Sequence, residues 1–177
     1  MRNHNTVRSR VVVVMVGSLV GIAVSIMFSR QAWAASRAGG TVLLFSHDDA
    51  RKLRLTDEQW RHPPHARALS AGPEIVIRSP QVVSGDVPTI ETQTPAKLVV
   101  LFEPRNSPVD MSSLAVEAHK GFFSKSLTDM LRPYIYNDSI EVSKAQIPAG
   151  KFLLDISIGD QAGNVTTATY RLKVDDE

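Results

Sequence analysis

The segments FLLDISIGD (residues 152–160), QAGN (161–164) and TATYRLKV (167–174) decide the fold. Apolar residues occupy every second position of both long segments: Phe152, Leu154, Ile156 and Ile158 in the first, and Ala168, Tyr170, Leu172 and Val174 in the second. This alternation is typical of antiparallel strands with one buried face. Because Gly163 and Asn164 favour a tight turn, the region is predicted to form a β-hairpin.

Weaker alternation extends this pattern back to residue 73. Four further strands are predicted: Glu74–Ser79, Lys97–Glu103, Leu114–His119 and Ile140–Val142. Residues 127–136 break the rhythm, with a helical turn at 127–131 and a doubtful seventh strand near Tyr134. About seven short strands over roughly 100 residues predict an all-β fold, a single two-sheet antiparallel sandwich.

The chain divides into three predicted parts. Residues 1–34 form a signal peptide, residues 35–72 a lead segment and residues 73–177 the sandwich domain. In the lead segment, Asp48 or Asp49 is expected to cap one short helix, and Thr56 with Gln59 has the form of a capping box. Leu55 and Trp60 are expected to pack onto the sandwich, because a large exposed tryptophan is unusual.

The N-terminus has the three parts of a secretory signal. An arginine-containing head without acidic residues precedes the uncharged run Val11–Phe28, and Ala32-Trp33-Ala34 has the small-x-small form of a cleavage site. We expect cleavage near Ala34 and a periplasmic or secreted protein. The alternative is an inner-membrane anchor formed by residues 11–28, which are just long enough to span a bilayer.

Charge and cysteine content narrow the function classes. Without residues 1–34 the chain keeps 16 basic and 18 acidic residues, so the whole-chain charge of +2 becomes −2. No basic-protein case for nucleic-acid binding remains. The absence of cysteine excludes disulfides, thiolate metal sites and cysteine nucleophiles. A disulfide-free exported domain of this size is typical of a bacterial envelope.

Four short motifs suggest a family. Ile77-Arg78-Ser79-Pro80, the strand 98–102, Ile147-Pro148-Ala149-Gly150 and Asp160-Gln161-Ala162-Gly163-Asn164 occur in that order. Together they resemble the bacterial immunoglobulin-like (Ig-like) domains of exported envelope and surface proteins over residues 74–174. The resemblance implies an Ig-like or fibronectin-III-like sandwich. It implies no function, because the matching residues form turns and such sandwiches serve many roles.

Aromatic residues supply the candidate binding surface. Phe122, Phe123, Tyr134 and Tyr136 lie at the two ends of an irregular insertion, residues 122–136, and would bind a glycan or protein partner if they are exposed. The alternative is that these rings belong to the core.

Metal sites and catalysis have less support. His62 and His65 match no recurrent ligand spacing, and His119 is expected at the surface. Asp155, Asp160 and Asn164 offer oxygen atoms for calcium, although the last two also suit a turn.

The sequence also lacks the usual signs of a copper carrier or a hydrolase. A copper carrier would need histidine near the mature start and clustered methionines, which the sequence lacks. No Gly-x-Ser-x-Gly is present, and the consecutive Ser46-His47-Asp48 cannot form a relay. No catalytic residue, metal ligand or cofactor is assigned.

The sequence therefore predicts an exported, non-catalytic Ig-like interaction module. Its expected partner is an envelope protein or another cell-surface component, and nucleic acid is not expected. Membrane contact is expected only through the leader, if the leader stays attached. The alternative function is a periplasmic module that binds a glycan or a metal such as copper or calcium. The sequence does not specify the individual partner, the oligomeric state or the pathway.

Overall fold

A computed structural model describes residues 41–63 and 68–175. The predicted leader and the start of the lead segment lie outside the described residues. The described part belongs to a unit that runs from Ala35 to Glu177. Among the described residues, no helix has the length and apolar character needed to cross a bilayer.

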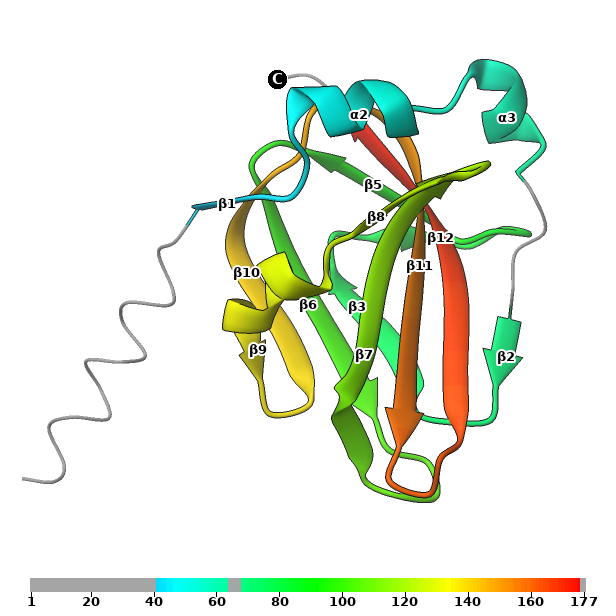
Figure 1. The fold of residues 1–177 in the computed structure, drawn as a ribbon, viewed down its shortest axis with the longest axis vertical. Helices are drawn as coiled ribbons and strands as arrows, with labels where there is room; N and C mark the ends of the chain where they lie inside the picture. The colour runs from blue at the N-terminus through cyan, green and yellow to red at the C-terminus, as the bar shows by residue number, and fades with distance from the viewer. Residues whose placement is uncertain (1–40, 64–67, 176–177) are drawn as a thin grey trace, which may run out of the picture. The chain divides into compact units, whose positions relative to one another are not determined.

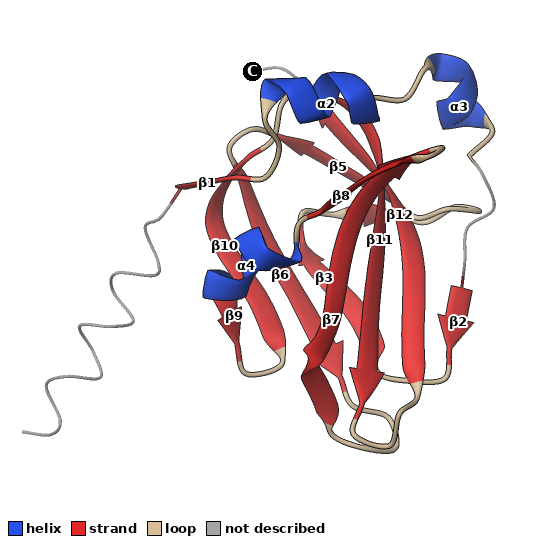
Figure 2. Cartoon of the chain, in the orientation of Figure 1, coloured by secondary structure: helices blue, strands red, loops and turns tan. Residues whose placement is uncertain are grey.

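Two mixed β-sheets form the domain (Figures 1 and 2). The first has the order β1 (Thr41–Leu43), β10 (Ser139–Gln146), β6 (Ala96–Glu103) and β3 (Glu74–Ser79), and β9 (Ile135–Tyr136) also pairs with β10. The second has the order β4 (Val82–Val83), β5 (Thr89–Gln93), β12 (Val165–Asp175), β11 (Gly150–Asp160), β7 (Val109–Lys120) and β8 (Phe123–Ser126), and β2 (Ala68–Ser70) also pairs with β12.

The sandwich-like, mostly β fold confirms the coarse prediction, but strictly antiparallel sheets are wrong. β1 pairs with β10 in parallel, and β5 pairs with β12 in parallel. Alternation reports which side of a strand is buried, but it carries no information about the direction of the neighbouring strand. β5 was missed because Ile90 is its only large apolar residue.

The last hairpin forms as predicted. β11 and β12 pair in antiparallel register from Gly150 opposite Val174 to Gly159 opposite Val165. The turn closes with a hydrogen bond from the amide of Asp160 to the carbonyl of Asn164, 2.9 Å apart. Gly163 adopts a φ of 85°, a conformation that glycine takes without steric cost.

The core lies between the two sheets, on the faces that the alternation predicted. Its largest fully buried members include Phe45, Phe102, Phe152, Ile147, Ile158 and Val142. Phe45 from the lead segment stacks on Phe152 of β11, with ring centroids 5.1 Å apart. The lead segment therefore contributes directly to the core of the sandwich.

Two short helices of the lead segment pack on one end of the sheets (Figure 1). In α2 (His47–Leu53) the N-cap is Ser46, which accepts a hydrogen bond from the amide of Asp49, so the predicted aspartate caps are wrong. Serine precedes the first helical residue, and its hydroxyl reaches the free amide groups. In α3 (Asp57–Arg61) Thr56 and Gln59 form the predicted capping box.

Trp60 packs onto the second sheet, as predicted. Its indole lies beside Arg171 of β12 and Lys151 of β11, with the cations 5.4 and 5.8 Å from the ring centroid. Leu153 points away from the core between the sheets and yet is fully buried. Leu55 is also buried, and its amide donates to the carbonyl of Lys151. The lead segment therefore covers part of the outer face of the second sheet.

Candidate partner-binding surface

The most exposed aromatic side chains lie at the tip of the β7–β8 hairpin. Lys120 pairs with Phe123 across the hairpin, and Gly121 with Phe122 forms the two-residue turn. Gly121 adopts a φ of 57° at the first turn position, where a type II′ turn requires glycine. Phe122 is fully exposed and Phe123 is 61% exposed. The fold thus holds two adjacent phenylalanines in water at the end of a paired strand.

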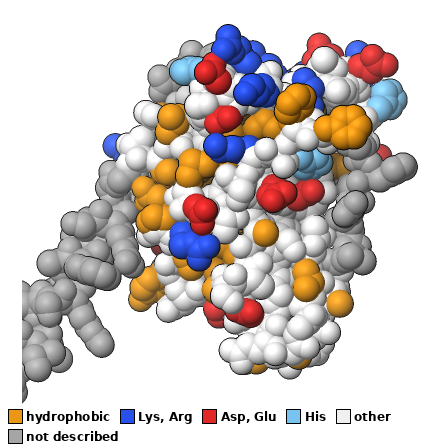
Figure 3. Space-filling model, in the orientation of Figure 1, with side chains coloured by type: hydrophobic (Ala, Val, Ile, Leu, Met, Phe, Trp, Pro, Cys, Tyr) orange, Lys and Arg blue, Asp and Glu red, His pale blue; other side chains and the backbone are white. Residues whose placement is uncertain are grey.

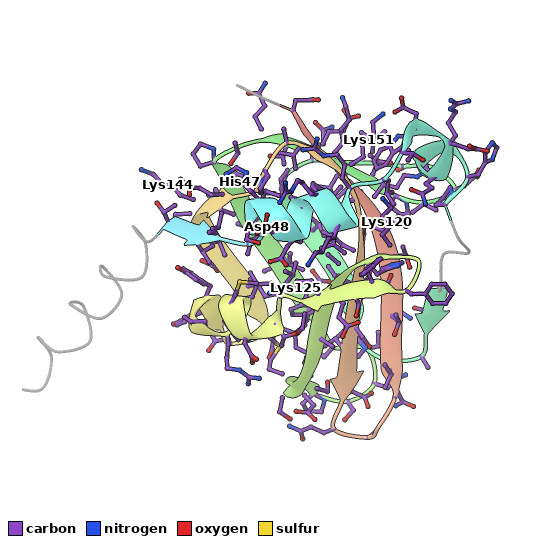
Figure 4. The ribbon with its side chains drawn as sticks, turned by 45° about the horizontal axis from the view of Figure 1, so that its top comes forward. His47, Asp48, Lys120, Lys125, Lys144 and Lys151 are labelled. Atoms are coloured by element: carbon purple, nitrogen blue, oxygen red, sulfur yellow. The ribbon has the colours of Figure 1, made fainter. Side chains whose placement is uncertain are left out.

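The base of this tip is joined to the lead segment (Figure 4). The ammonium group of Lys120 donates to the carbonyl of Arg54, 2.6 Å away. On the other strand, Lys125 lies 3.5 Å from the carboxylate of Asp49 in α2. The hydrogen bond of Ser46 is the main cause that lowers the pKa of Asp49, with a further contribution from Lys125. These contacts hold the hairpin against α2.

The two tyrosines of the predicted surface lie elsewhere. Tyr134 ends a short 3-10 helix, η1 (Arg132–Tyr134), and packs partly buried against the core. Tyr136 is 63% exposed in β9, and its carbonyl accepts a hydrogen bond from the hydroxyl of Ser139. β9 lies far from the hairpin tip in the view of Figure 1, beyond β8 and α4 (Thr128–Leu131). The predicted four-residue surface is therefore not one patch.

The helical turn predicted at residues 127–131, just before these two tyrosines, is present in the structure as α4. Pro133 follows this turn and lies inside η1. Proline is tolerated in the first turn of a helix, because the amide there has no helical partner to lose.

Basic residues outnumber acidic ones in the segments that carry the phenylalanine pair, α2 and α3. We define the basic end as residues 46–63, 119–126 and 148–151, which contain seven Lys and Arg against four Asp and Glu. The other described residues contain seven Lys and Arg against twelve Asp and Glu. In Figure 3, Lys and Arg side chains lie at the end that carries α2, together with acidic and exposed hydrophobic side chains. The described domain is thus electrostatically asymmetric, although its net charge is close to zero.

The sequence contained a signal for this basic end that the prediction did not use. Lys120-Gly121-Phe122-Phe123-Ser124-Lys125 places an aromatic pair between two lysines. α2 lies beside this hairpin, and α3 packs through Trp60 on β11 and β12. Both positions depend on tertiary contacts, which no local pattern reports.

A polar cluster on the outer face of the second sheet was also missed. His119 of β7 lies 3.3 Å from the carboxylate of Asp155 in β11, and Thr169 of β12 donates to that carboxylate at 2.6 Å. His119 is partly buried here, with 23% of its side chain exposed. The acid lies between the hydroxyl and the imidazole. A serine-type relay needs the imidazole in the middle, so this order does not activate Thr169 as a nucleophile.

The side chain of Asp160 serves the turn. Its carboxylate accepts hydrogen bonds from the amides of Ala162 and Asn164 and from the side-chain amide of Asn164, at 2.9–3.3 Å. The bond from the Asn164 side chain is the largest cause that lowers the pKa of Asp160, and the turn amides add to it. Asp155 is engaged with Thr169 on the outer face of the sheet. Asp155, Asp160 and Asn164, the three candidate calcium ligands, are therefore engaged in hydrogen bonds within the fold.

Within the described residues, the lead-segment histidines His47 and His62 do not come together with other metal ligands. In the described ranges, no group of three or more histidine, aspartate or glutamate side chains is placed to bind a metal ion. His65 lies outside these ranges, so its pairing with His62 stays a prediction.

Two hollows lined by described residues are candidate ligand sites. One is an apolar space of about 60 Å³ within the core, lined by residues such as Phe45, Ile77 and Leu154. The other is an open groove of about 670 Å³ beside α2, lined by residues that include Arg54, Lys151 and Lys173.

Neither hollow is a clear binding site. The apolar space is far below the roughly 300 Å³ at which small-molecule pockets begin. In the groove, Arg54 donates to the carbonyl of Ala149, and Lys151 and Lys173 donate to the carboxylates of Asp57 and Asp175. Lys151 and Lys173 are thus paired with carboxylates. The hairpin tip is the stronger candidate surface because it combines two exposed phenylalanines with Lys120 and Lys125.

Comparison of the chain with models of known protein families, with curated protein sequences and with solved structures gave no match.

Proposed function

We propose that this chain is an exported, non-catalytic Ig-like module of a bacterial envelope, which binds an envelope partner through the β7–β8 tip. The observation that carries the proposal is the exposure of Phe122 beside Phe123 on a hydrogen-bonded hairpin. Exposed apolar area costs free energy in water, at roughly 25 cal/mol per Å². Adjacent exposed phenylalanines therefore suggest a surface that is covered in the working protein.

Export is supported by residues 1–34. A basic head, an uncharged run and Ala32-Trp33-Ala34 stand in the order that a secretory signal requires. The domain that follows contains no cysteine, so its stability depends on the core between the sheets. Intact mass and N-terminal sequencing of the protein from its native envelope test this part. A mature start at Ala35 is expected, and a chain that keeps Met1–Ala34 would contradict cleavage.

A binding role is also supported over a catalytic one. The His119–Asp155–Thr169 cluster has the wrong order for a nucleophilic relay, and its imidazole is half-buried. Asp160 is engaged in stabilising a turn. The hairpin tip, in contrast, offers exposed apolar area with neighbouring cations and no reactive group, which suits adhesion to a surface.

Affinity capture tests the proposed function. The full chain carries a tag after Glu177 and is recovered from native envelope after mild crosslinking. The wild type is compared with the F122S/F123S variant and with Y136S, which removes a ring at β9 that is about as exposed as Phe123. We expect F122S/F123S to lose the captured component and Y136S to keep it. Equal capture by all three proteins would exclude the hairpin tip as the binding surface.

A further inference from the structure

We infer that the partner of the β7–β8 tip is an anionic lipid surface, into which Phe122 and Phe123 insert while the basic end contacts the headgroups. This inference rests on the proposed function, because it names the partner of the same surface. It is carried by the shape of the tip, by its charge and by the bonding of its lysines.

The shape of the tip suits a bilayer. Phe122 lies in a two-residue turn, and both it and Phe123 are exposed. The apolar area is therefore a projection and not a groove or a flat patch. A projecting pair of rings needs a partner that surrounds it, and the headgroup region of a bilayer does so without a preformed pocket. Phenylalanine is one of the residues that amphipathic structures place at this depth.

The charge distribution selects an anionic surface. The basic end has three more Lys and Arg than Asp and Glu, whereas the remaining described residues have five fewer. An anionic bilayer would attract the first group and repel the second, so the domain would approach with the hairpin tip forward. This orientation brings Phe122 to the surface first. The attraction acts within about 8 Å at physiological salt, which is sufficient for side chains beside the tip.

The lysines beside the phenylalanines keep bonding capacity for phosphate. An ammonium group has three donors, and the structure gives Lys120 one hydrogen bond, to the carbonyl of Arg54. Lys125 is 41% exposed and pairs with Asp49 at 3.5 Å, a weak surface ion pair that lipid phosphate can replace. Both lysines flank the phenylalanine pair in the sequence, so phosphate contact and ring insertion can occur together.

A site-specific fluorescent probe tests the inference in the full chain. Because the sequence has no cysteine, S124C introduces a single labelling site beside Phe123 and leaves both rings in place. A162C places the same probe on the turn of the β11–β12 hairpin, which lies at the opposite end of the domain in Figure 1. An environment-sensitive label reports insertion at each position. Any binding through the leader is common to both labelled proteins, so it does not produce a difference between them.

The vesicles contain phosphatidylcholine alone or with about 30 mol% phosphatidylglycerol, a lipid that supplies a negative surface potential. We expect label intensity at position 124 to rise at least about threefold with the anionic vesicles, and at position 162 to stay unchanged. F122S/F123S in the S124C background should abolish this rise. K120Q/K125Q should weaken binding about tenfold, and the control K97Q/R132Q, with charges outside the basic end, should bind like the parent.

Three outcomes would overturn the inference. They are an equal rise with neutral vesicles, an equal rise at position 162, and no rise at position 124. If label intensity does not rise but F122S/F123S still loses an envelope protein in the capture experiment, the lipid partner is excluded and the proposed function is retained. If label intensity does not rise and F122S/F123S captures the same envelope components as the wild type, both proposals fail.

Discussion

Lys120 of β7 donates a hydrogen bond to the main-chain oxygen of Arg54, 2.6 Å away and 66 residues earlier in the chain. This contact joins the aromatic hairpin to the lead segment that carries α2 and α3. The two segments therefore form one end of the domain, in which exposed rings lie beside basic side chains. The predictions below test first the scaffold that positions this end and then the surface itself.

A charge at Ile156 should damage the fold severely. It is buried between the two sheets, and an aspartate there would be an unpaired charge in an apolar core. We expect I156D to lose more than about 3 kcal/mol of the free energy of unfolding, and in practice to prevent folding. Circular dichroism during heating measures the effect, with V165D as the control at an exposed apolar position. An I156D protein that melts like the wild type would show that the assigned facing of β11 is wrong.

Trp60 should stabilise the packing of the lead segment on the second sheet. W60A removes the ring beside Arg171 and Lys151 and uncovers part of that face, so we expect a loss of about 1–2 kcal/mol. W60F retains a ring and should recover at least half of this loss. Urea unfolding of the three proteins gives the comparison. If W60A unfolds at the wild-type midpoint, α3 does not contribute to stability through this contact.

Two threonines of β12 provide a matched pair for the polar cluster. Thr169 donates to the carboxylate of Asp155, whereas Thr167 shares a hydrogen bond with the neutral hydroxyl of Ser157, 3.0 Å away. Hydrogen bonds to charged groups are stronger than those between neutral groups. We expect T169V to cost about 1–2 kcal/mol and T167V about 0.5–1 kcal/mol of unfolding free energy, measured in urea. The reverse order would contradict the role given to Asp155.

Asp160 should make part of the stability depend on pH. Its folded pKa is lowered, chiefly by the side chain of Asn164, so its charged form stabilises the fold. That contribution is complete above the ordinary aspartate pKa of about 3.9 and is lost as the pH falls through the lower folded value. The urea midpoint of D160N should therefore lie below that of the wild type at pH 7, and the gap should narrow below about pH 4. A gap that is constant from pH 7 to about pH 2 would contradict this assignment.

The fold was predictable where the local sequence pattern shows which residues are buried or which residues cap a helix. The regular alternation from Phe152 to Val174 predicted the last hairpin and its buried face, and Thr56 with Gln59 predicted a capping box. β1 and β5 could not be paired in this way, because both add in parallel to strands far away in the sequence.

The candidate surface was predictable only in part. The exposure of Phe122 follows from its place in a two-residue turn after Gly121. For Tyr134 and Tyr136, in contrast, the local sequence does not show which ring is buried and which is exposed. The difference between them is tertiary, since η1 packs Tyr134 against the core while β9 leaves Tyr136 exposed. The basic end likewise depends on α2 meeting the hairpin and on α3 packing against β11 and β12.

Photocrosslinking in living cells tests most directly whether the β7–β8 tip is the contact surface. A benzophenone amino acid replaces Phe122 in one protein and Val165, an exposed apolar residue of β12, in the other. The account predicts a covalent adduct to an envelope component from position 122 and none from position 165. Equal adducts from both positions, or an adduct from position 165 alone, would contradict it.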